Sequence, residues 1–218
     1  MRSVATFFLL TFALAWAFFI AGVITGRQAI FTIGVFAPAA AGLLMTPRGE
    51  RGALLRRVLQ WRVRWTYYAI AIFLMSAIKL TTALLARVAT GSWPKFGTTP
   101  FVILLIATLL STPVQAGEEI GWRGYALPRL IERVGFTGGS IVLGVVWALW
   151  HIPQFFLPGA EAPIQWLPLF VIQVVAYSIL LAWLYVRTNG SLLLTMLMHA
   201  AFNNMKDIVP SAGSPQLA

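Results

Sequence analysis

Long apolar runs separated by short polar segments make up most of this chain. Seven runs rich in Ile, Leu, Phe, Val, Ala and Trp cover Val4–Ile24, Ala29–Met45, Thr66–Val88, Phe101–Ala116, Gly138–Gln154, Ile164–Val186 and Ser191–Asn203. A helix needs roughly 20 residues to cross a hydrocarbon core of about 30 Å, so the shorter runs must extend into their flanks or tilt. The pattern predicts an all-α, polytopic transmembrane helix bundle of about seven spans, within a range of six to eight.

The composition agrees with a membrane protein. Of the 218 residues, 59% are hydrophobic and only 10% are charged, whereas soluble domains carry about 25% charged residues. A soluble enzyme and a disordered chain are therefore excluded. The chain has no cysteine, which excludes disulfides and thiol nucleophiles. Since no internal repeat or low-complexity linker is present, we expect one membrane domain over residues 1–218, with its motif-bearing core at about 100–204.

The positive charges lie between the apolar runs, where they indicate membrane topology and not nucleic-acid binding. The net charge is +10, and Arg48–Arg64 contains six arginines against Glu50. The positive-inside rule places this segment and the N-terminus in the cytoplasm. The segment fits either an interfacial helix on anionic head groups or a topology signal without a ligand. We expect a multi-pass protein of a bacterial cell membrane with membrane lipids as partners, its first run serving as an uncleaved signal anchor.

Ionisable side chains inside or beside apolar runs are the candidates for function. A charged group at the centre of a span costs about 2.5–3.5 kcal/mol on insertion scales. Glu118 and Glu119 lie at the end of the fourth run, just after Ala116, and the two histidines of the chain, His151 and His199, lie within later runs. Such groups need polar partners or water. We therefore expect them to meet at an active site inside the bundle.

Helical spacing predicts how the first motif is arranged. Glu119 and Arg123 are four residues apart, so they share a helix face and can form an ion pair. Glu118 points about 100° away from Glu119 around the helix. It is therefore free to face a cavity.

The later motifs have the same spacing. His199 and Asn203 are four residues apart on one face of a mostly apolar run, and Trp147 lies one turn before His151, where its ring can wall the imidazole. A carboxylate beside a neutral imidazole can activate water as a general base. A second imidazole and an amide can supply donors to an oxyanion. The set predicts a hydrolase for amide bonds that needs no covalent nucleophile.

Other protease chemistries lack their residues in this chain. Asp207 is the only aspartate, so a two-aspartate intramembrane protease is excluded. The chain contains no His-Glu-x-x-His helix and no Gly-x-Ser-x-Gly elbow.

Three motifs in order on separate runs resemble those of the CPBP family of intramembrane proteases (CAAX protease and bacteriocin-processing), which includes the type II CAAX prenyl endopeptidases. They are Glu118-Glu119-x-x-x-Arg123, Trp147-x-x-x-His151 and His199-x-x-x-Asn203. The resemblance implies a catalytic set of Glu118, His151, His199 and Asn203. The first two would activate water, and the last two would stabilise the oxyanion.

The resemblance also implies supporting residues. Glu119 and Arg123 would orient and hold the site. The second motif of the family usually begins with Phe, whereas this chain has Trp147. This substitution keeps an aromatic wall but enlarges it, so we expect it to affect substrate preference more than catalysis.

The expected function is that of an intramembrane endopeptidase. Its substrate would be a membrane-associated or lipid-modified protein, with a C-terminal prenyl group as one option. No cofactor is required, although a zinc-dependent version with Glu118, His151 and His199 as ligands stays open. The alternative is a non-proteolytic protein that uses the same polar cluster, either a self-immunity partner against a bacteriocin or toxin, or a proton-coupled carrier.

The bounds of the apolar runs place Glu118 and His151 at different depths, which conflicts with a site that contains both. Glu118 ends its run, whereas His151 lies about 20 Å along the next run by helical rise. Either the helix that carries Glu118 continues past Gly121, or the following segment packs inward. Pro128 is the expected break in the helix.

Overall fold

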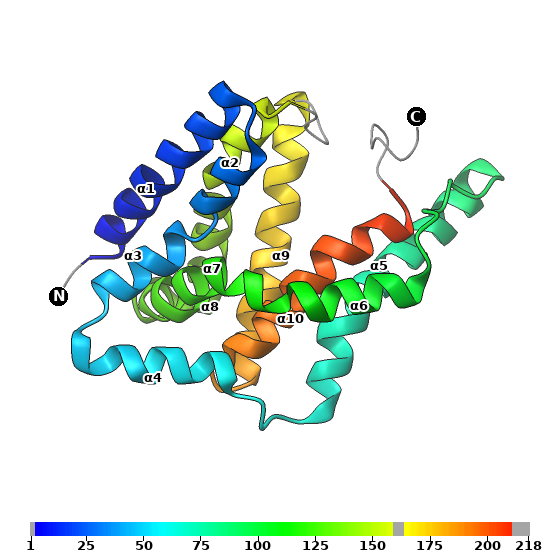
Figure 1. The fold of residues 1–218 in the computed structure, drawn as a ribbon. Coiled ribbons are helices and arrows are strands. Elements are labelled where there is room, and N and C mark those ends of the chain that lie inside the picture. The colour runs from blue at the N-terminus through cyan, green and yellow to red at the C-terminus, as the bar shows by residue number, and fades with distance from the viewer. Residues whose placement is uncertain (1–2, 159–163, 211–218) are drawn as a thin grey trace.

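Helices account for every regular element in residues 3–158 and 164–210, which are the residues that this computed structural model describes. Figure 1 shows their arrangement. The α-helices are α1 (Val4–Thr25), α2 (Gln28–Gly34), α3 (Ala37–Met45), α4 (Arg51–Arg56), α5 (Trp65–Thr90), α6 (Phe101–Ser111), α7 (Ala116–Glu119), α8 (Leu127–Trp150), α9 (Leu167–Arg187) and α10 (Leu192–Met205). The all-α prediction is confirmed.

Short helices of other pitch connect these elements. The 3-10 helices are η1 (Arg48–Glu50), η2 (Arg57–Leu59), η3 (Thr112–Gln115), η5 (Ile152–Phe156), η6 (Ile164–Trp166) and η7 (Lys206–Ile208), and η4 (Ile120–Ala126) is a π-helix. A π turn inside an α-helical stretch is rare and often marks a functional site. In this chain it begins directly after Glu119.

Five helical stretches in the described residues are long and apolar enough to cross a membrane, and the chain is an integral membrane protein. They are Val4–Thr25, Gln28–Met45, Trp65–Thr90, Phe101–Phe156 and Ile164–Arg187. This number is below the expected seven for two reasons. The runs at Phe101–Ala116 and Gly138–Gln154 fall within one continuous stretch, and the last run forms α10, which has only 14 residues and is about 21 Å long.

The stretch Phe101–Phe156 has 56 residues and would be about 84 Å long as a straight helix. The structure breaks it at Gly135, whose φ of 74° and ψ of 174° are not helical. This backbone region is essentially open to glycine alone. The prediction of a break at Pro128 was wrong, because Pro128 lies in the first turn of α8, where proline is tolerated.

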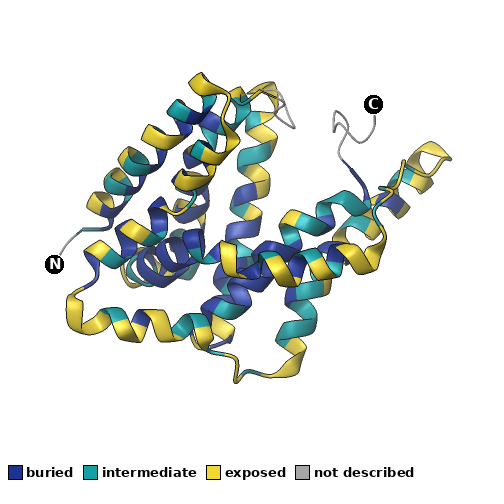
Figure 2. Ribbon diagram, viewed as in Figure 1, coloured by how far each residue is buried: buried dark blue, intermediate teal, exposed yellow. Residues whose placement is uncertain are grey.

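The last helix, α10, lies at the centre of the bundle. It packs against α5, α6, α9 and η3, and Figure 2 shows it and α7 mostly in the dark blue of buried residues. A helix that is apolar on all sides is expected in such a position. Its polar residues Thr195 and His199 are buried among the other helices.

Close backbone contact fixes α3 against η4. A Cβ atom on Gly121 would collide with the carbonyl of Pro38, and a Cβ on Gly42 would lie 3.2 Å from the Cα of Gly121. Only glycine permits this approach. The π-helix that carries Arg123 is thus held directly on the α3 backbone.

The basic segment is helical from Arg48 to Leu59, as expected for an interfacial helix. Leu54 is buried against the bundle, whereas Leu55 and Leu59 are exposed. Figure 1 shows α4 lying across the lower edge of the molecule.

Candidate active site

The acid pair lies where the helical pitch changes twice. Glu118 and Glu119 end α7, a single α-turn between the 3-10 helix η3 and the π-helix η4. Glu118 is 5% exposed and Glu119 is fully buried. The helix therefore continues past Gly121, and it carries both acids into the interior of the bundle instead of ending with them at its surface.

Glu119 connects three helices. Its Oε1 accepts one hydrogen bond from the Arg123 guanidinium at 2.9 Å and another from His199 Nδ1 at 2.9 Å. The side chains of Glu119 and Arg123 are fully buried. The predicted ion pair is confirmed, and it also ties α10 to α7 and η4.

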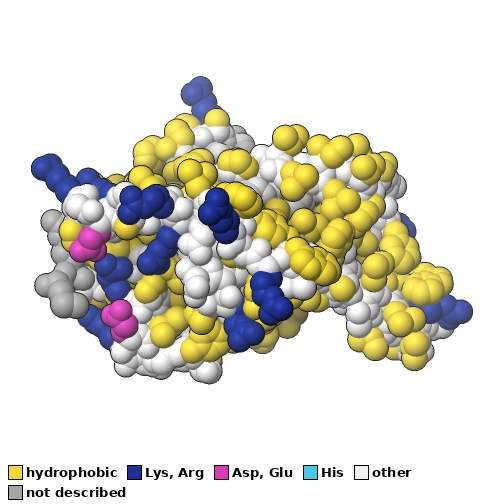
Figure 3. Space-filling model, turned by 90° about the horizontal axis from the view of Figure 1, so that it is seen from below, with side chains coloured by type: hydrophobic (Ala, Val, Ile, Leu, Met, Phe, Trp, Pro, Cys, Tyr) yellow, Lys and Arg dark blue, Asp and Glu magenta, His cyan; other side chains and the backbone are white. Residues whose placement is uncertain are grey.

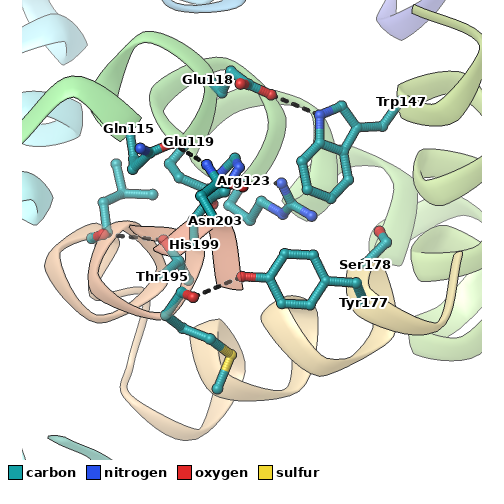
Figure 4. A network of polar contacts seen from close by, with 12 residues as sticks. Gln115, Glu118, Glu119, Arg123, Trp147, Tyr177, Ser178, Thr195, His199 and Asn203 are labelled. Atoms are coloured by element: carbon teal, nitrogen blue, oxygen red, sulfur yellow. Dashed lines mark hydrogen bonds and ion pairs between the residues drawn. The ribbon is translucent and has the colours of Figure 1, made fainter. Parts of the chain in front are cut away.

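Glu118 has a separate partner. Its Oε2 accepts a hydrogen bond of 2.7 Å from the indole N–H of Trp147. Figure 4 shows the two carboxylates pointing apart, one toward Trp147 and the other toward Arg123 and His199. This divergence is the one predicted from the rotation of 100° per residue along a helix.

Trp147 is the shared neighbour of the site. Its ring lies 5.6 Å from the His151 ring and 5.3 Å from the His199 ring, measured between centroids. The guanidinium of Arg123 lies 4.2 Å from its centroid, which is a cation–π contact. The wall predicted for His151 is therefore present, and Trp147 joins all three motifs.

His151 is held in one tautomer. Its Nδ1 lies 2.8 Å from the backbone carbonyl of Trp147. Because a carbonyl can only accept, Nδ1 carries the proton, and Nε2 of the neutral ring keeps a lone pair. His151 is half-buried, so this nitrogen can serve as a base.

Asn203 lies at the edge of the cluster. It is exposed, and its Nδ2 donates to Gln115 Oε1 at 3.5 Å. His199, one turn earlier, is only 4% exposed. The polar face predicted for α10 thus runs from the interior of the bundle to its surface.

Two residues of this network escaped the sequence reasoning. Gln115 contacts Asn203, and Tyr177 donates its hydroxyl to the carbonyl of Met198 at 2.8 Å. The Tyr177 ring also stacks on Trp147, with centroids 5.9 Å apart. Each is a polar residue inside an apolar run, which was the available signal. Gln115 also lies three and four positions before Glu118 and Glu119, at helical spacing.

Several polar atoms of the site have no hydrogen-bond partner among the described residues. They are Oε2 of Glu119 and Nε and Nη2 of Arg123. Burial of such groups without a partner is costly. Their arrangement leaves hydrogen-bonding capacity for water or for a polar ligand.

The alternative metal set does not form a ligand cluster. In the described part of the chain, no group of three or more His, Cys, Asp or Glu side chains is arranged to hold a metal ion. Glu118 and His151 instead bond to Trp147, and Nδ1 of His199 bonds to Glu119. Each histidine uses Nδ1 in these contacts and Glu118 uses one oxygen, so the zinc-dependent alternative stays a prediction.

Comparison with known proteins agrees with the resemblance seen in the motifs. A family model described as "Type II CAAX prenyl endopeptidase Rce1-like" matches residues 97–205, which is half of the chain and includes all three motifs. A curated relative, CAAX prenyl protease 2 of Methanococcus maripaludis, is 29% identical over 153 residues, covering 64% of this chain and 55% of the relative. The chain thus spans about half the length of that relative.

Proposed function

Since this chain belongs to the Rce1-like family of type II CAAX prenyl endopeptidases, we propose that it hydrolyses a peptide bond of a membrane-associated or lipid-modified protein within the membrane. Glu118 and His151 activate the water, and His199 and Asn203 stabilise the oxyanion. The observation that supports this proposal best is that Trp147 bonds to both members of the first pair, through its indole N–H and through its carbonyl.

The first step is attack by water. Glu118 is anchored through Oε2, so its other oxygen is available to a water molecule. His151 presents Nε2 with a lone pair. As the water oxygen bonds to the scissile carbonyl carbon, one proton of the water passes to the general base formed by Glu118 and His151. The same proton then goes to the amide nitrogen as the C–N bond breaks, which releases an amine and a carboxylic acid, and the acid then passes its own proton to the amine or to solvent.

The second requirement is stabilisation of the tetrahedral oxyanion. His199 is fixed through Nδ1 on Glu119, and a proton on Nε2 would be its donor to the oxyanion. Asn203 has two N–H donors and lies one turn further along α10. Arg123, held between Glu119 and the Trp147 ring, fixes the carboxylate in place.

The test compares detergent-purified wild type with Glu118→Gln and His151→Ala on one fluorogenic peptide, prepared with and without a C-terminal prenylated cysteine. Asp207→Asn is the matched control, because it converts a carboxylate to an amide in η7, outside the network. We expect wild type and control to cleave and both site variants to lose activity while keeping the melting temperature.

Two further arms sharpen the result. Cleavage that survives exhaustive chelation supports the metal-free reaction, and a comparison of the two peptides shows whether the prenyl group is needed. Full activity in folded Glu118→Gln, or no cleavage of either peptide by folded wild type, contradicts the proposal. The second outcome would favour a self-immunity partner or a proton-coupled carrier.

A further inference from the structure

A cavity of about 820 Å³ lies away from the active site, between the end of α3, the segment η1–α4, and the η4–α8 junction. Six charged side chains line it, four of them basic: Arg48, Arg51, Arg129, Arg133, Glu50 and Glu132. Volumes of this size are typical of ligand pockets. With four arginines against two glutamates, the lining has a net positive charge and favours an anion.

Two of the arginines are held in position by other contacts. Arg51 Nε donates to the carbonyl of Thr46 at 3.1 Å. The Arg129 guanidinium donates to the carbonyl of Tyr125 at 2.8 Å and lies 3.8 Å from the centroid of the Tyr125 ring. Each contact uses part of a guanidinium group that has five N–H donors. The remaining donors are preorganised for a ligand.

The cavity lies where a membrane-spanning stretch ends. The candidate span Gln28–Met45 stops at one wall, and exposed Leu44 adds an apolar side chain to the lining. Figure 3 shows basic side chains gathered on the face seen from below, with acidic side chains among them. Basic pockets at the ends of spans are suited to the head groups of anionic lipids.

We propose that this cavity binds the phosphate group of an anionic membrane lipid. The arginines contact the phosphate, and the apolar part of the lining, with Leu44 and Met45, accepts the start of the acyl region. A free phosphate ion would satisfy the arginines but would have no use for these apolar residues or for a cavity of this volume.

Such a lipid would connect two parts of the fold. Its site joins α3 and α4 to the π-helix, since Tyr125 lies in η4 two residues after Arg123. A bound phosphate therefore holds together the elements that position the Glu119–Arg123 pair. The expected consequence is a higher melting temperature in anionic lipid.

Binding is measured on the full chain in detergent, by native mass spectrometry and thermal unfolding. The probes are dioctanoyl phosphatidylglycerol, dioctanoyl phosphatidylcholine and inorganic phosphate. The test variant, Arg48→Gln/Arg133→Gln, changes two exposed lining residues whose side chains make no hydrogen bond or ion pair to a described residue. The matched control, Arg56→Gln/Arg64→Gln, removes the same charge from exposed positions of the basic segment outside the cavity.

We expect wild type to bind phosphatidylglycerol in preference to phosphatidylcholine and to melt at a higher temperature with it. The lining variant should bind phosphatidylglycerol about tenfold more weakly, because each arginine near an anionic head group adds to the binding free energy. The control should match wild type. Lipid binding and melting temperature do not depend on peptidase activity, so this experiment tests the lipid site independently of the proposed reaction.

Three results would overturn the lipid site. Equal losses in the two double variants would show diffuse attraction to the basic segment. Inorganic phosphate that raises the melting temperature as much as the lipid would make the ligand a free anion. Competition by a peptide with a free C-terminal carboxylate, but not by its amide, would assign the cavity to a peptide.

Discussion

His199 Nδ1 and Glu119 Oε1 lie 2.9 Å apart although 80 positions separate the two residues in the chain. The same oxygen accepts from Arg123, so one buried carboxylate serves two donors. The adjacent Glu118 bonds instead to Trp147. The two neighbouring glutamates therefore make different contacts: Glu119 joins three helices, whereas Glu118 has one oxygen free for the water of the proposed reaction.

Replacing each glutamate by glutamine should separate an effect on stability from an effect on activity. Glu119→Gln leaves buried Arg123 without its anionic partner, and we expect it to lower the free energy of unfolding by about 3–5 kcal/mol. Glu118→Gln can still accept the indole N–H, so its stability should change by less than about 1 kcal/mol while activity is lost. Reversible unfolding in detergent and peptide cleavage measure the two effects. Equal loss of stability in both variants would contradict the division.

The two adjacent asparagines of α10 provide a matched pair. Asn203 is exposed at the edge of the network, whereas Asn204 donates to Ser111 Oγ at 3.0 Å and to the carbonyl of Ala200 at 2.8 Å. We expect Asn203→Ala to lower kcat by about 10²–10³-fold with little change in KM, as for loss of an oxyanion donor.

Asn204→Ala should leave kcat nearly unchanged and cost about 1 kcal/mol of stability. Steady-state kinetics and thermal unfolding of both variants supply the comparison. If Asn204→Ala lowers kcat as much as Asn203→Ala, the oxyanion role of Asn203 is wrong.

Shortening the Trp147 side chain first to Phe and then to Ala should affect activity first and stability second. Trp147→Phe keeps an aromatic ring beside Arg123 and both histidines, and the His151 bond to the backbone carbonyl is retained. Only the hydrogen bond to Glu118 is lost, so we expect kcat/KM to fall about tenfold and the preference among peptide side chains to change.

Trp147→Ala also removes the cation–π contact and opens a cavity, which should cost about 3–5 kcal/mol of stability. Cleavage of a small panel of peptides and melting temperatures test this order. Full inactivation by Trp147→Phe, or unchanged stability in Trp147→Ala, would be the contrary result.

The break in α8 depends on one glycine. Gly135 has a φ of 74° and a ψ of 174°, and no atom lies within 4 Å of the position of a Cβ. Any loss in Gly135→Ala therefore comes from the backbone, and we expect about 1–3 kcal/mol. Gly52→Ala is the control, because Gly52 lies in α4 with equally open surroundings. Equal melting temperatures for the two variants would show that the backbone at Gly135 is unstrained by alanine.

Helical periodicity predicted the contacts within each motif. The Glu119–Arg123 pair, the divergent direction of Glu118 and the wall beside His151 all follow from spacings of one to four residues. The contacts between motifs could not be obtained in this way. The Glu119–His199 bond and the Glu118–Trp147 bond depend on how distant helices pack, which a single sequence does not specify.

The ends of the predicted membrane spans differ from those of the helices for a related reason. Apolar runs report which residues avoid water, but they do not show whether one helix ends before the next begins. Phe101–Ala116 and Gly138–Gln154 therefore counted as two spans, although a π turn and the conformation of Gly135 join them in one bent stretch. Proline is a stronger sequence indicator of a helix break than glycine, yet the backbone bends at Gly135 and not at Pro128.

The π-helix also limits how the length of this chain can change. Each residue added to or removed from a helix rotates everything beyond it by about 100°. Glu118 and Trp147 are 29 positions apart along helical backbone that is bent but not interrupted by a loop. A deletion of one residue within Ile120–Ala126 would turn Trp147 and His151 away from the glutamates, and a deletion before Arg123 would turn Arg123 as well. Family members that keep this chemistry should therefore conserve the number of residues between the first two motifs, whatever their sequence.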